Sequence, residues 1–309
     1  MAQLTTYAAV GNKEDVTGLV TMISPEETPL FSMLPQGKAT NTTHSWLNKA
    51  LRAAKVNTTV EGGNLTYEAA KARTKSYNYT QIFQQGYSVT GTQEVVAKFG
   101  GITSEIDDSM ADAMKELALD VELAWISEDE KEDGDASTAR IAGGLPAFIS
   151  TNKMANSGAD RTYTETLLKS AIQKCWTAGG VPKYVYQSGD NQNIANGFKG
   201  GNLTNQDAKS KKVVAAVDVY VSSFGTVNFV PHRQLANTEV FVVDAQYLAT
   251  DFLRRFSDEE LPKTTDSLTH NILGELTFVC KAEAANAWIT DLNAQERGFP
   301  LSKFLEVIF

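Results

Sequence analysis

The sequence contains little cysteine, histidine and proline, and it lacks long apolar runs. Its 309 residues include only 2 Cys, 3 His and 8 Pro. Cys175 and Cys280 lie far apart with no Cys-x-x-Cys spacing, which excludes a disulfide framework and a zinc ribbon and predicts two buried thiols. Apolar runs such as Val213–Val217 are much shorter than the roughly 18 residues that span a bilayer. We therefore expect a soluble protein with no membrane partner.

Sequence signatures of catalysis and of cofactor binding are also missing. His44, His232 and His270 form no His-Glu-x-x-His motif and no close pair. There is no Gly-x-Ser-x-Gly elbow, no Walker loop and no Gly-x-Gly-x-x-Gly motif after a strand. We expect no catalytic residue, no cofactor and no metal, and hence a structural or binding protein that is not an enzyme.

Basic residues are outnumbered, and the excess of acid lies in one segment. The chain has 37 Asp and Glu against 28 Lys and Arg, a net charge of -9 that opposes binding to nucleic-acid phosphates. Residues 105–135 hold 13 of the acids and 2 of the bases, which leaves the rest of the chain nearly neutral. The acids of this segment include Asp108, Asp112, Glu116, Asp120 and Glu122.

Apolar residues of the same segment recur with the period of a helix. Ser104 followed by Asp107 is typical of a capping box at its start. The pattern predicts a helix over residues 104–131, roughly 40 Å long at about 1.5 Å per residue. Its acidic side has two interpretations. It is either the solvated face of an ordinary amphipathic helix, or the face of a long structural helix that lies opposite another molecule and must not bind it. The apolar stripe, at spacings of three or four, is Ile102, Ile106, Met110, Met114, Leu117, Val121 and Trp125.

The stretch from Lys75 to Thr90 alternates with the period of a strand. Polar residues fall on even positions, and only Ile82 departs from the pattern. Thr43–Leu51 is expected to pair with this strand, with a distal turn over residues 55–65. Because a lone hairpin is marginal in water, the arm must lie on its own core or on another molecule. Its apolar face comprises Tyr77, Tyr79, Phe83, Tyr87 and Val89.

The regions on either side of the arm and the helix differ in pattern. The first 40 residues are polar and turn-rich, with Pro29–Leu34 as their apolar cluster, so they form a frayed terminus or an arm that docks elsewhere. After the helix, the chain is patterned as a compact α/β unit. Helices are predicted over Thr164–Ala178 and Ala245–Phe256, and strands over residues 181–187, 213–221, 226–230, 240–243 and 272–280.

The order of these elements resembles the major capsid protein fold of tailed bacteriophages, known as the Hong Kong 97 fold. Local sequences strengthen the resemblance to one podophage-type capsid family, which covers about residues 20 to 292. They are Thr28–Leu34, Trp46 with Leu51, Glu61-Gly62, Asn78 with Gln81-Ile82, Val89–Gln93, Glu116–Ile126, Ala139-Arg140 with Gly144-Leu145, Ile149, Thr151-Asn152, Leu261–Thr264, Leu276–Val279 and Ile289–Leu292.

The resemblance implies an α+β subunit divided as in that fold. The expected parts are an N-terminal arm (1–42), an extended loop hairpin (43–92), a spine helix with peripheral domain (93–155), an axial domain (156–245), and a return to the peripheral domain with a C-terminal tail (246–309). The apolar tail over residues 299–309 departs from the family pattern.

The resemblance also implies a function. The expected protein assembles as hexamers and pentamers into the icosahedral or elongated head shell of a phage and encloses double-stranded DNA. It is made in the bacterial cytoplasm and resides in the virion. The expected partners are other copies of the chain, a scaffolding protein, the portal, decoration proteins and, through weak non-specific contact, the packaged DNA. No built-in scaffolding segment is visible, so a separate scaffolding protein is expected.

Two sets of residues are assigned roles on this basis, and two alternatives stay open. The alternatives are an encapsulin-like compartment shell and, from another class, a soluble ligand-binding or hydrolytic protein. The acidic face of the spine helix, Asp108, Asp112, Glu116, Asp120 and Glu122, is expected to face the shell interior. The assembly interface is expected to include Phe31, Leu34, Trp46, Glu61, Tyr77, Tyr79, Phe83 and Tyr87.

Overall fold

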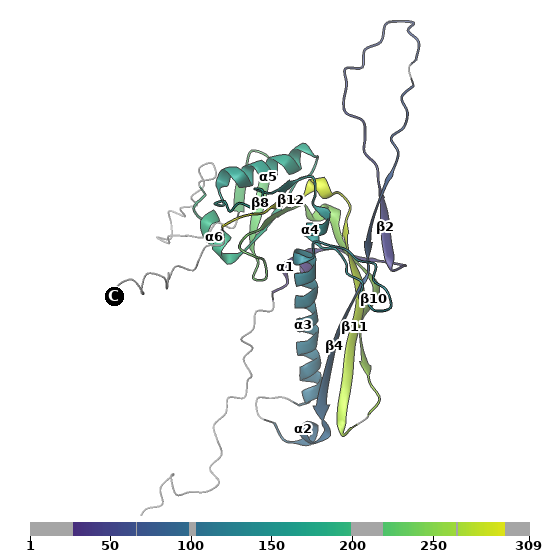
Figure 1. The fold of residues 1–309 in the computed structure, drawn as a ribbon, viewed down its shortest axis with the longest axis vertical. Helices are drawn as coiled ribbons and strands as arrows, with labels where there is room; N and C mark the ends of the chain where they lie inside the picture. Colours follow the sequence, from purple (N-terminus) through teal and green to yellow (C-terminus); the bar gives the residue numbers. More distant parts are fainter. Residues whose placement is uncertain (1–26, 66, 99–102, 199–218, 264, 294–309) are drawn as a thin grey trace, which may run out of the picture.

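The computed structural model describes residues 27–65, 67–98, 103–198, 219–263 and 265–293. It consists of an elongated part built on a four-stranded sheet, a compact part built on a six-stranded sheet, and a hairpin arm that extends away from both (Figure 1). The first 26 residues and the apolar tail at 299–309 lie outside the described residues. In the described part of the chain, no helix is long and apolar enough to cross a membrane.

Helix α3, Glu105–Ser127, is the spine of the elongated part and begins where the sequence predicts. The Ser104 hydroxyl accepts a hydrogen bond from the Asp107 backbone N–H at 3.2 Å, and three acidic residues occupy the positive first turn. The helix ends at Ser127 instead of the predicted Lys131. At Glu128 the backbone turns extended, and its carbonyl accepts from the Gly144 N–H at 2.9 Å, which continues the chain as a loop.

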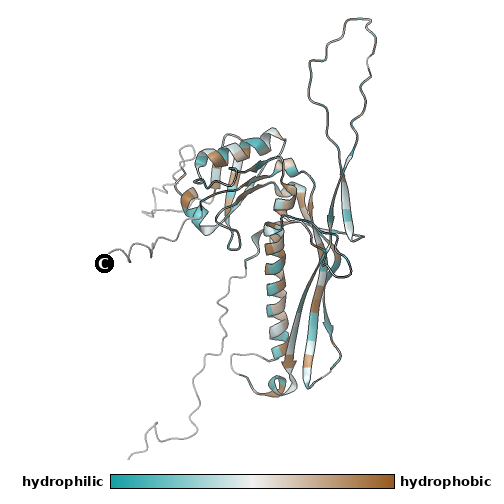
Figure 2. Ribbon diagram, viewed as in Figure 1, coloured by the Kyte–Doolittle hydropathy of each residue, from teal (hydrophilic) through white to brown (hydrophobic). Residues whose placement is uncertain are grey.

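The four-stranded sheet has the order β1-β10-β11-β4, and α3 packs along it. Its strands are β1 (Gln36–Lys38), β4 (Gln81–Thr90), β10 (Leu248–Glu260) and β11 (Ser267–Cys280). The short helices α1 (Pro29–Met33), α2 (Gly91–Val95) and α4 (Leu145–Phe148) flank it. Hydrophilic and hydrophobic residues alternate along α3 and the strands beside it (Figure 2), as expected for elements with one face in the core.

The predicted helix over Ala245–Phe256 is wrong. Asp244 caps only a single 3-10 turn, Ala245–Tyr247, through a hydrogen bond from the Gln246 N–H. From Leu248 onward the chain is strand β10, which pairs antiparallel with β11 and parallel with β1. Its apolar residues fit a helical stripe, but pairing with strands distant in sequence decides the conformation.

The predicted strand over residues 75–90 is in fact two strands. β3 (Thr74–Tyr79) pairs with β2 (Thr43–Asn48) in the arm, while β4 pairs with β11 in the sheet. The alternation changes phase between them, because Asn78 and Thr80 are fully buried although they occupy the even, polar positions. Ile82, the departure from the pattern, is 46% exposed.

The compact part matches the predicted α/β unit closely. Its sheet has the order β5-β12-β9-β6-β8-β7, and the predicted helix is α5 (Glu165–Thr177), capped by Thr164 and followed by Gly179 at φ +91°. Residues 213–218 of one predicted strand lie outside the described residues. The strands are β5 (Lys153–Met154), β6 (Tyr184–Gln187), β7 (Val219–Ser222), β8 (Gly225–Pro231), β9 (Val240–Val243) and β12 (Ala287–Ile289), with helix α6 (Gly189–Ala195) beside them.

Each part has its own apolar core. Trp125, Phe278 and Leu30 are fully buried in the elongated part, and Leu168, Ile172 and Val242 in the compact part. Both cysteines are buried as free thiols, which confirms the prediction, and burial raises the pKa of each to about 12.

Candidate assembly interface

The distal arm exposes large apolar side chains. β2 and β3 pair from Thr43↔Tyr79 to Asn48↔Thr74, and the chain between them continues as an extended loop far from both sheets (Figure 1). Apolar side chains exposed together on this loop are unfavourable in water, which indicates that another molecule covers them. Its exposed fractions are Leu47 64%, Leu51 88%, Val56 88%, Val60 79%, Leu65 74% and Tyr67 86%.

Asn78 holds the base of the arm on the body of the subunit, by which we mean the two sheets and their helices. Its side-chain amide donates to the Gly143 carbonyl at 2.9 Å and to the Phe278 carbonyl at 2.7 Å. Its side-chain oxygen accepts from the N–H groups of Gly143 and Tyr79. This pairing satisfies a fully buried amide, and it explains why a polar residue occupies an inward position.

A second buried group fixes the junction between β3 and β4. Glu275 is 4% exposed and accepts from Arg140 at 2.7 Å, Arg254 at 3.1 Å and the Thr80 hydroxyl at 2.6 Å. Arg140 also donates to the Thr80 carbonyl at 3.1 Å. The carboxylate therefore joins β11, β10, the loop after α3 and the start of β4, and it sets the direction in which the arm leaves the body.

The predicted aromatic residues of the arm lie near this base. Tyr77 and Tyr79 contact edge to face, with ring centroids 5.6 Å apart, and Trp46 lies 5.8 Å from Phe148. The Lys131 ammonium lies over the rings of Tyr77 and Phe148, and burial lowers its pKa. Tyr77 keeps 38% of its surface exposed, and Trp46 and Tyr79 are half-buried, so all three retain surface for a partner.

Four of the predicted interface residues lie elsewhere. Leu34 and Phe83 are 3% and 6% exposed within the elongated core, so they are removed from the candidate interface. Phe31 packs against that core, as does Tyr87, which stacks on His270 and donates to Asp258 at 3.0 Å. Burial and that hydrogen bond raise the pKa of Tyr87 to about 12.

The remaining predicted interface residue, Glu61, lies at the distal turn. It is exposed there, beside Gly62, which adopts φ +78°. Of the eight predicted interface residues, Trp46, Glu61, Tyr77 and Tyr79 therefore keep surface on the arm.

The acidic residues of α3 divide into surface and buried groups. Asp108, Glu116 and Asp120 are exposed and Asp112 is half-buried, which leaves them on a solvated face. Glu122 is fully buried, so its assignment to that face is wrong. In the sequence Glu122 directly follows Val121 of the apolar stripe, so it lies at the border of that stripe, and its spacing alone does not assign it to either face.

Glu122 joins three distant segments. Its carboxylate accepts from the backbone N–H groups of Leu30 at 2.8 Å and Phe31 at 2.6 Å, and it contacts His232 Nε2 at 2.6 Å. His232 Nδ1 accepts from the Gln234 N–H at 3.2 Å, so the ring proton lies on Nε2 and donates to Glu122. The N-terminal helix α1 is thereby attached to the spine and to the chain after β8. No motif in the sequence pointed to His232.

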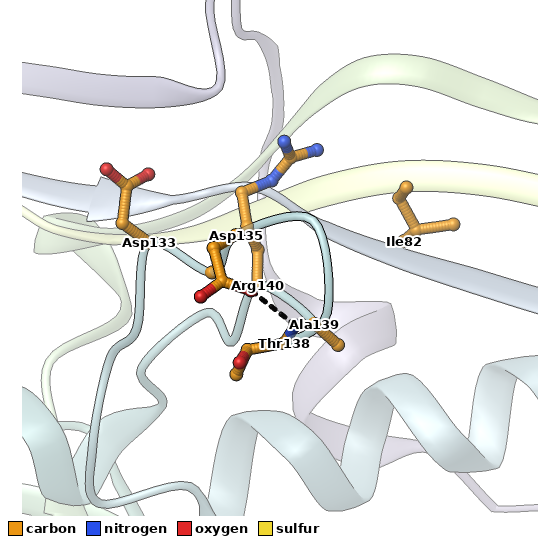
Figure 3. Close-up of a pocket in the computed structure, with 7 residues that line it drawn as sticks. Ile82, Asp133, Asp135, Thr138, Ala139 and Arg140 are labelled. Atoms are coloured by element: carbon orange, nitrogen blue, oxygen red, sulfur yellow. Dashed lines mark hydrogen bonds between the residues drawn. The ribbon is translucent and has the colours of Figure 1, made fainter.

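A groove of about 350 Å³ opens between α3 and β4, lined by Ile82, Phe83, Leu117, Asp120, Leu123 and Glu128 among others. Ile82 also lines a neighbouring hollow of about 410 Å³, formed with the loop 133–140 (Figure 3). In that loop the Asp135 carboxylate accepts from the N–H groups of Ser137 and Thr138, which holds its pKa down at about 2. Gly134 is required there, because at φ +68° a Cβ would lie 2.6 Å from the Thr138 carbonyl.

Neither hollow has the character of a catalytic pocket. Both are open and shallow beside the acidic face, and no group of three or more metal-ligating side chains occurs in the described part of the chain. The arrangement instead provides surfaces for contact with other molecules, namely the exposed arm, its fixed base and the open groove.

Comparison with known proteins agrees with this arrangement. The model of the SU10 major capsid protein family matches residues 3–293. No curated protein matches the chain in sequence.

Three solved structures show the same fold at low identity. The cyanophage A-1(L) capsid asymmetric unit is similar with a TM-score of 0.66 and 12% identity, over 93% of this chain and 98% of that chain. A structure of phage G major capsid and decoration proteins has a TM-score of 0.57 at 10% identity, over 94% and 99%. The SrpI encapsulin complex of Synechococcus elongatus has a TM-score of 0.62 at 9% identity, over 97% and 99%.

The order of arm, spine helix, elongated sheet and compact sheet is thus the Hong Kong 97-like order that the sequence predicts. A capsid subunit of this kind is a structural shell component and has no catalytic activity. Because the family model covers nearly the whole chain, the chain belongs to the SU10 major capsid protein family.

Proposed function

We propose that this shell protein assembles as hexamers and pentamers into a closed icosahedral head that encloses phage double-stranded DNA. The observation that carries the proposal is the distal arm, whose apolar residues are 64–88% exposed in the single chain. In a head-to-tail ring, each arm finds the surface of the next copy, and the same contact closes the ring. The subunit is made in the host bacterial cytoplasm and ends in the virion.

The interface proposed here centres on Trp46, Tyr77, Tyr79, Glu61 and the distal arm. These residues keep surface exposed while the base beneath them is fixed by Asn78 and Glu275. A rigid base and an uncovered tip suit obligate contact, in which aromatic and apolar residues supply most of the binding free energy.

The remaining surfaces are assigned to other partners. The face with Asp108, Asp112, Glu116 and Asp120 is proposed to face the interior, where its negative charge keeps packaged DNA in weak, non-specific contact. A scaffolding protein and the portal are proposed as partners during assembly. Decoration proteins are proposed by analogy with phage G, whose structure contains them.

The subdivision predicted from the sequence is retained with this function. The elongated sheet with α3 is proposed as the peripheral domain and the six-stranded sheet as the axial domain. β1 and β4 of the elongated sheet lie in the segments assigned to the N-terminal arm and the extended loop. β5 and β12 join the six-stranded sheet although they lie in segments assigned to the peripheral domain, so the boundaries near residues 155 and 245 cross the sheet.

The test removes the apolar character of the distal arm. Leu51→Asp with Val56→Asp leaves the body untouched, so we expect folded, soluble subunits that form at least about tenfold fewer closed particles. Thr58→Asp is the matched control, because it adds a charge to the same loop and keeps every apolar side chain. Electron microscopy and light scattering, with a scaffolding protein supplied, measure the yield. Normal particles from the double variant would contradict the proposal.

An encapsulin-like shell is the second candidate, favoured by the likeness to the SrpI encapsulin. The two functions differ in what the particle holds. A DNA-packaging head carries nucleic acid, whereas a compartment shell carries protein cargo. The ratio of absorbance at 260 and 280 nm of particles purified from the native host distinguishes them.

A further inference from the structure

The compact sheet ends at an uncovered strand, β7. It is the last strand in the order β5-β12-β9-β6-β8-β7, and in the described part of the chain it pairs only with β8. Val219 and Val221 are 52% and 50% exposed on one face of this edge. An open edge strand with apolar side chains pairs easily with another strand, and proteins normally cover or charge such an edge. The outer edge of β7 is therefore a surface that needs a cover.

The opposite face of the same edge is apolar as well. The Tyr220 hydroxyl donates to Glu165 of α5 at 2.8 Å, so α5 covers the face opposite the two valines. Phe224, in the turn after β7, lies with its ring 5.4 Å from that of Trp176 at the end of α5, and Trp176 is 53% exposed. A strand added beside β7 thus meets valines on one face and aromatic rings on the other.

The chain holds an apolar segment that has no assigned partner. Residues 294–309 follow the last described residue and lie beyond the family match, which ends at residue 293. Within residues 304–309 every side chain except that of Glu306 is apolar, and branched and aromatic types of this kind favour strands. As a strand, this segment is apolar on both faces, like the edge of β7. Its apolar members are Phe304, Leu305, Val307, Ile308 and Phe309.

The last described residues lie within reach of β7. Leu292 forms a bridge with Arg161, and the Asn293 N–H donates to the Arg161 carbonyl at 2.8 Å, just beyond the end of β12. β7 lies four strand positions from β12, which is about 19 Å at about 4.8 Å per strand. Residues 294–303 span up to roughly 33 Å when extended, so residues 304–309 reach β7 of their own subunit.

The strand pairing also sets the direction of approach. β12 ends where β9 begins, and β6 and β8 both end on this side of the sheet. β7 is antiparallel to β8, so it begins on this side and runs away from it. A segment that arrives from the end of β12 therefore runs parallel to β7 and meets the Trp176–Phe224 pair at the far end.

We propose that residues 304–309 dock as a parallel strand on the outer edge of β7 in the same subunit. The side chains of this strand contact the two exposed valines on one face and the Trp176–Phe224 pair on the other. The contact covers a sheet edge that otherwise pairs with the same edge of another copy. The tail thereby prevents the compact parts of free subunits from joining edge to edge.

Cysteine pairing locates the tail. In the full chain, Val221→Cys on β7 is combined in turn with Leu305→Cys, Val307→Cys and Ile308→Cys. A disulfide needs Cβ atoms about 3.8 Å apart, so oxidation reports close contact. The two native thiols are buried, and each single variant controls for them. We expect at least one pair to form a disulfide within one chain, identified by non-reducing electrophoresis and by mass spectrometry of the digested protein.

A matched control separates docking from random collision of the tail. Gln173→Cys, on the exposed side of α5 and off the edge of β7, is combined with the same tail variants. We expect the best Val221→Cys pair to oxidise at least about tenfold faster than any control pair. Equal rates would overturn the proposal, and so would disulfides that join two copies of the chain, because these place the tail on another subunit.

Hydrogen exchange and fluorescence supply a second measurement. Val307→Asp with Ile308→Asp places a charge on each face of the tail strand. We expect the outward-pointing amides of β7 to exchange at least about tenfold faster, and the emission of Trp176, identified by comparison with Trp176→Phe, to shift to longer wavelength. Ser302→Asp is the matched control, because it adds a charge to the tail ahead of the apolar segment.

The outcomes also separate the tail contact from the shell function. If the charged tail variant leaves both exchange and emission unchanged, the proposal is wrong. Both measurements report on a single chain and need no particle, so particles that form normally while the edge of β7 is unprotected reject the tail contact and leave the shell function standing.

Discussion

The body and the distal arm differ in how far they bury their apolar side chains. In the body, Trp125 and Phe278 are fully buried, and buried polar groups such as Glu275 are matched to partners. In the arm, Leu51 and Val56 are 88% exposed. The body therefore completes its own core, whereas the arm is completed only by another molecule. Variants that alter one region should leave the properties of the other unchanged.

The largest effect on the body is expected from Glu122→Ala. The change leaves the N–H groups of Leu30 and Phe31 and the His232 ring N–H buried without an acceptor. We expect the free energy of unfolding to fall by about 3–5 kcal/mol. Denaturant unfolding in the non-assembling arm background measures it. Asp120→Ala, on the solvated face, is the control at about 0.5 kcal/mol or less. Equal losses from the two variants would show that the buried contact is unimportant.

A smaller effect is expected from Asn78→Ala at the border between the two regions. It removes the partners of Gly143 and of the Phe278 carbonyl. We expect a loss of about 1–3 kcal/mol, with faster hydrogen exchange across β2 and β3. Asn48→Ala in the same hairpin is the control, because its side-chain amide donates to the Ser76 hydroxyl at a site that is only partly buried. Unchanged exchange at the arm base would argue against Asn78 as its anchor.

The smallest effect is a pH dependence in the loop 133–140. Hydrogen bonds from Ser137 and Thr138 lower the pKa of Asp135 to about 2, below the roughly 3.9 of an unfolded Asp. A lowered carboxyl pKa adds stability above the unfolded value, and this stability is lost as pH falls toward 2. The protection factors of the amides in this loop, taken relative to the intrinsic exchange rate at each pH, should therefore fall between about pH 4 and 2. Asp135→Asn should remove the dependence, and Asp133→Asn should keep it.

Elements with local signals were predicted well from the sequence. The cap at Ser104, the helix over residues 164–178 and the alternation of β4 all depend on residues within a few positions of one another. The order of such elements was enough to indicate the fold, although the compared structures share only 9–12% identity with this chain.

Elements decided by distant partners were predicted poorly. Leu248 to Phe256 became a strand because β1 and β11 flank it, although its spacing also suits a helix. The side chains of Asn78 and Glu122 point inward because their hydrogen-bond partners lie in the core. These partners are Gly143, Phe278, Leu30 and His232, and they lie 65 to 200 residues away in the sequence. Of the eight predicted interface residues, four keep surface on the arm. The exposed apolar residues of its loop, such as Leu51 and Val56, were not predicted, and neither was the groove, because its walls come from separate segments.

The contact between Glu122 and His232 also bears on when the subunit can fold. The two residues are 110 positions apart, so a ribosome adding about 5–20 residues per second needs roughly 6–22 s to pass from one to the other. During that interval the carboxylate has no histidine, and the arm has already left the exit tunnel with its apolar residues uncovered. The nascent chain is therefore most prone to premature association through its arm before the body has folded. A factor that covers the arm at this stage prevents more association than one that covers the arm of the finished subunit.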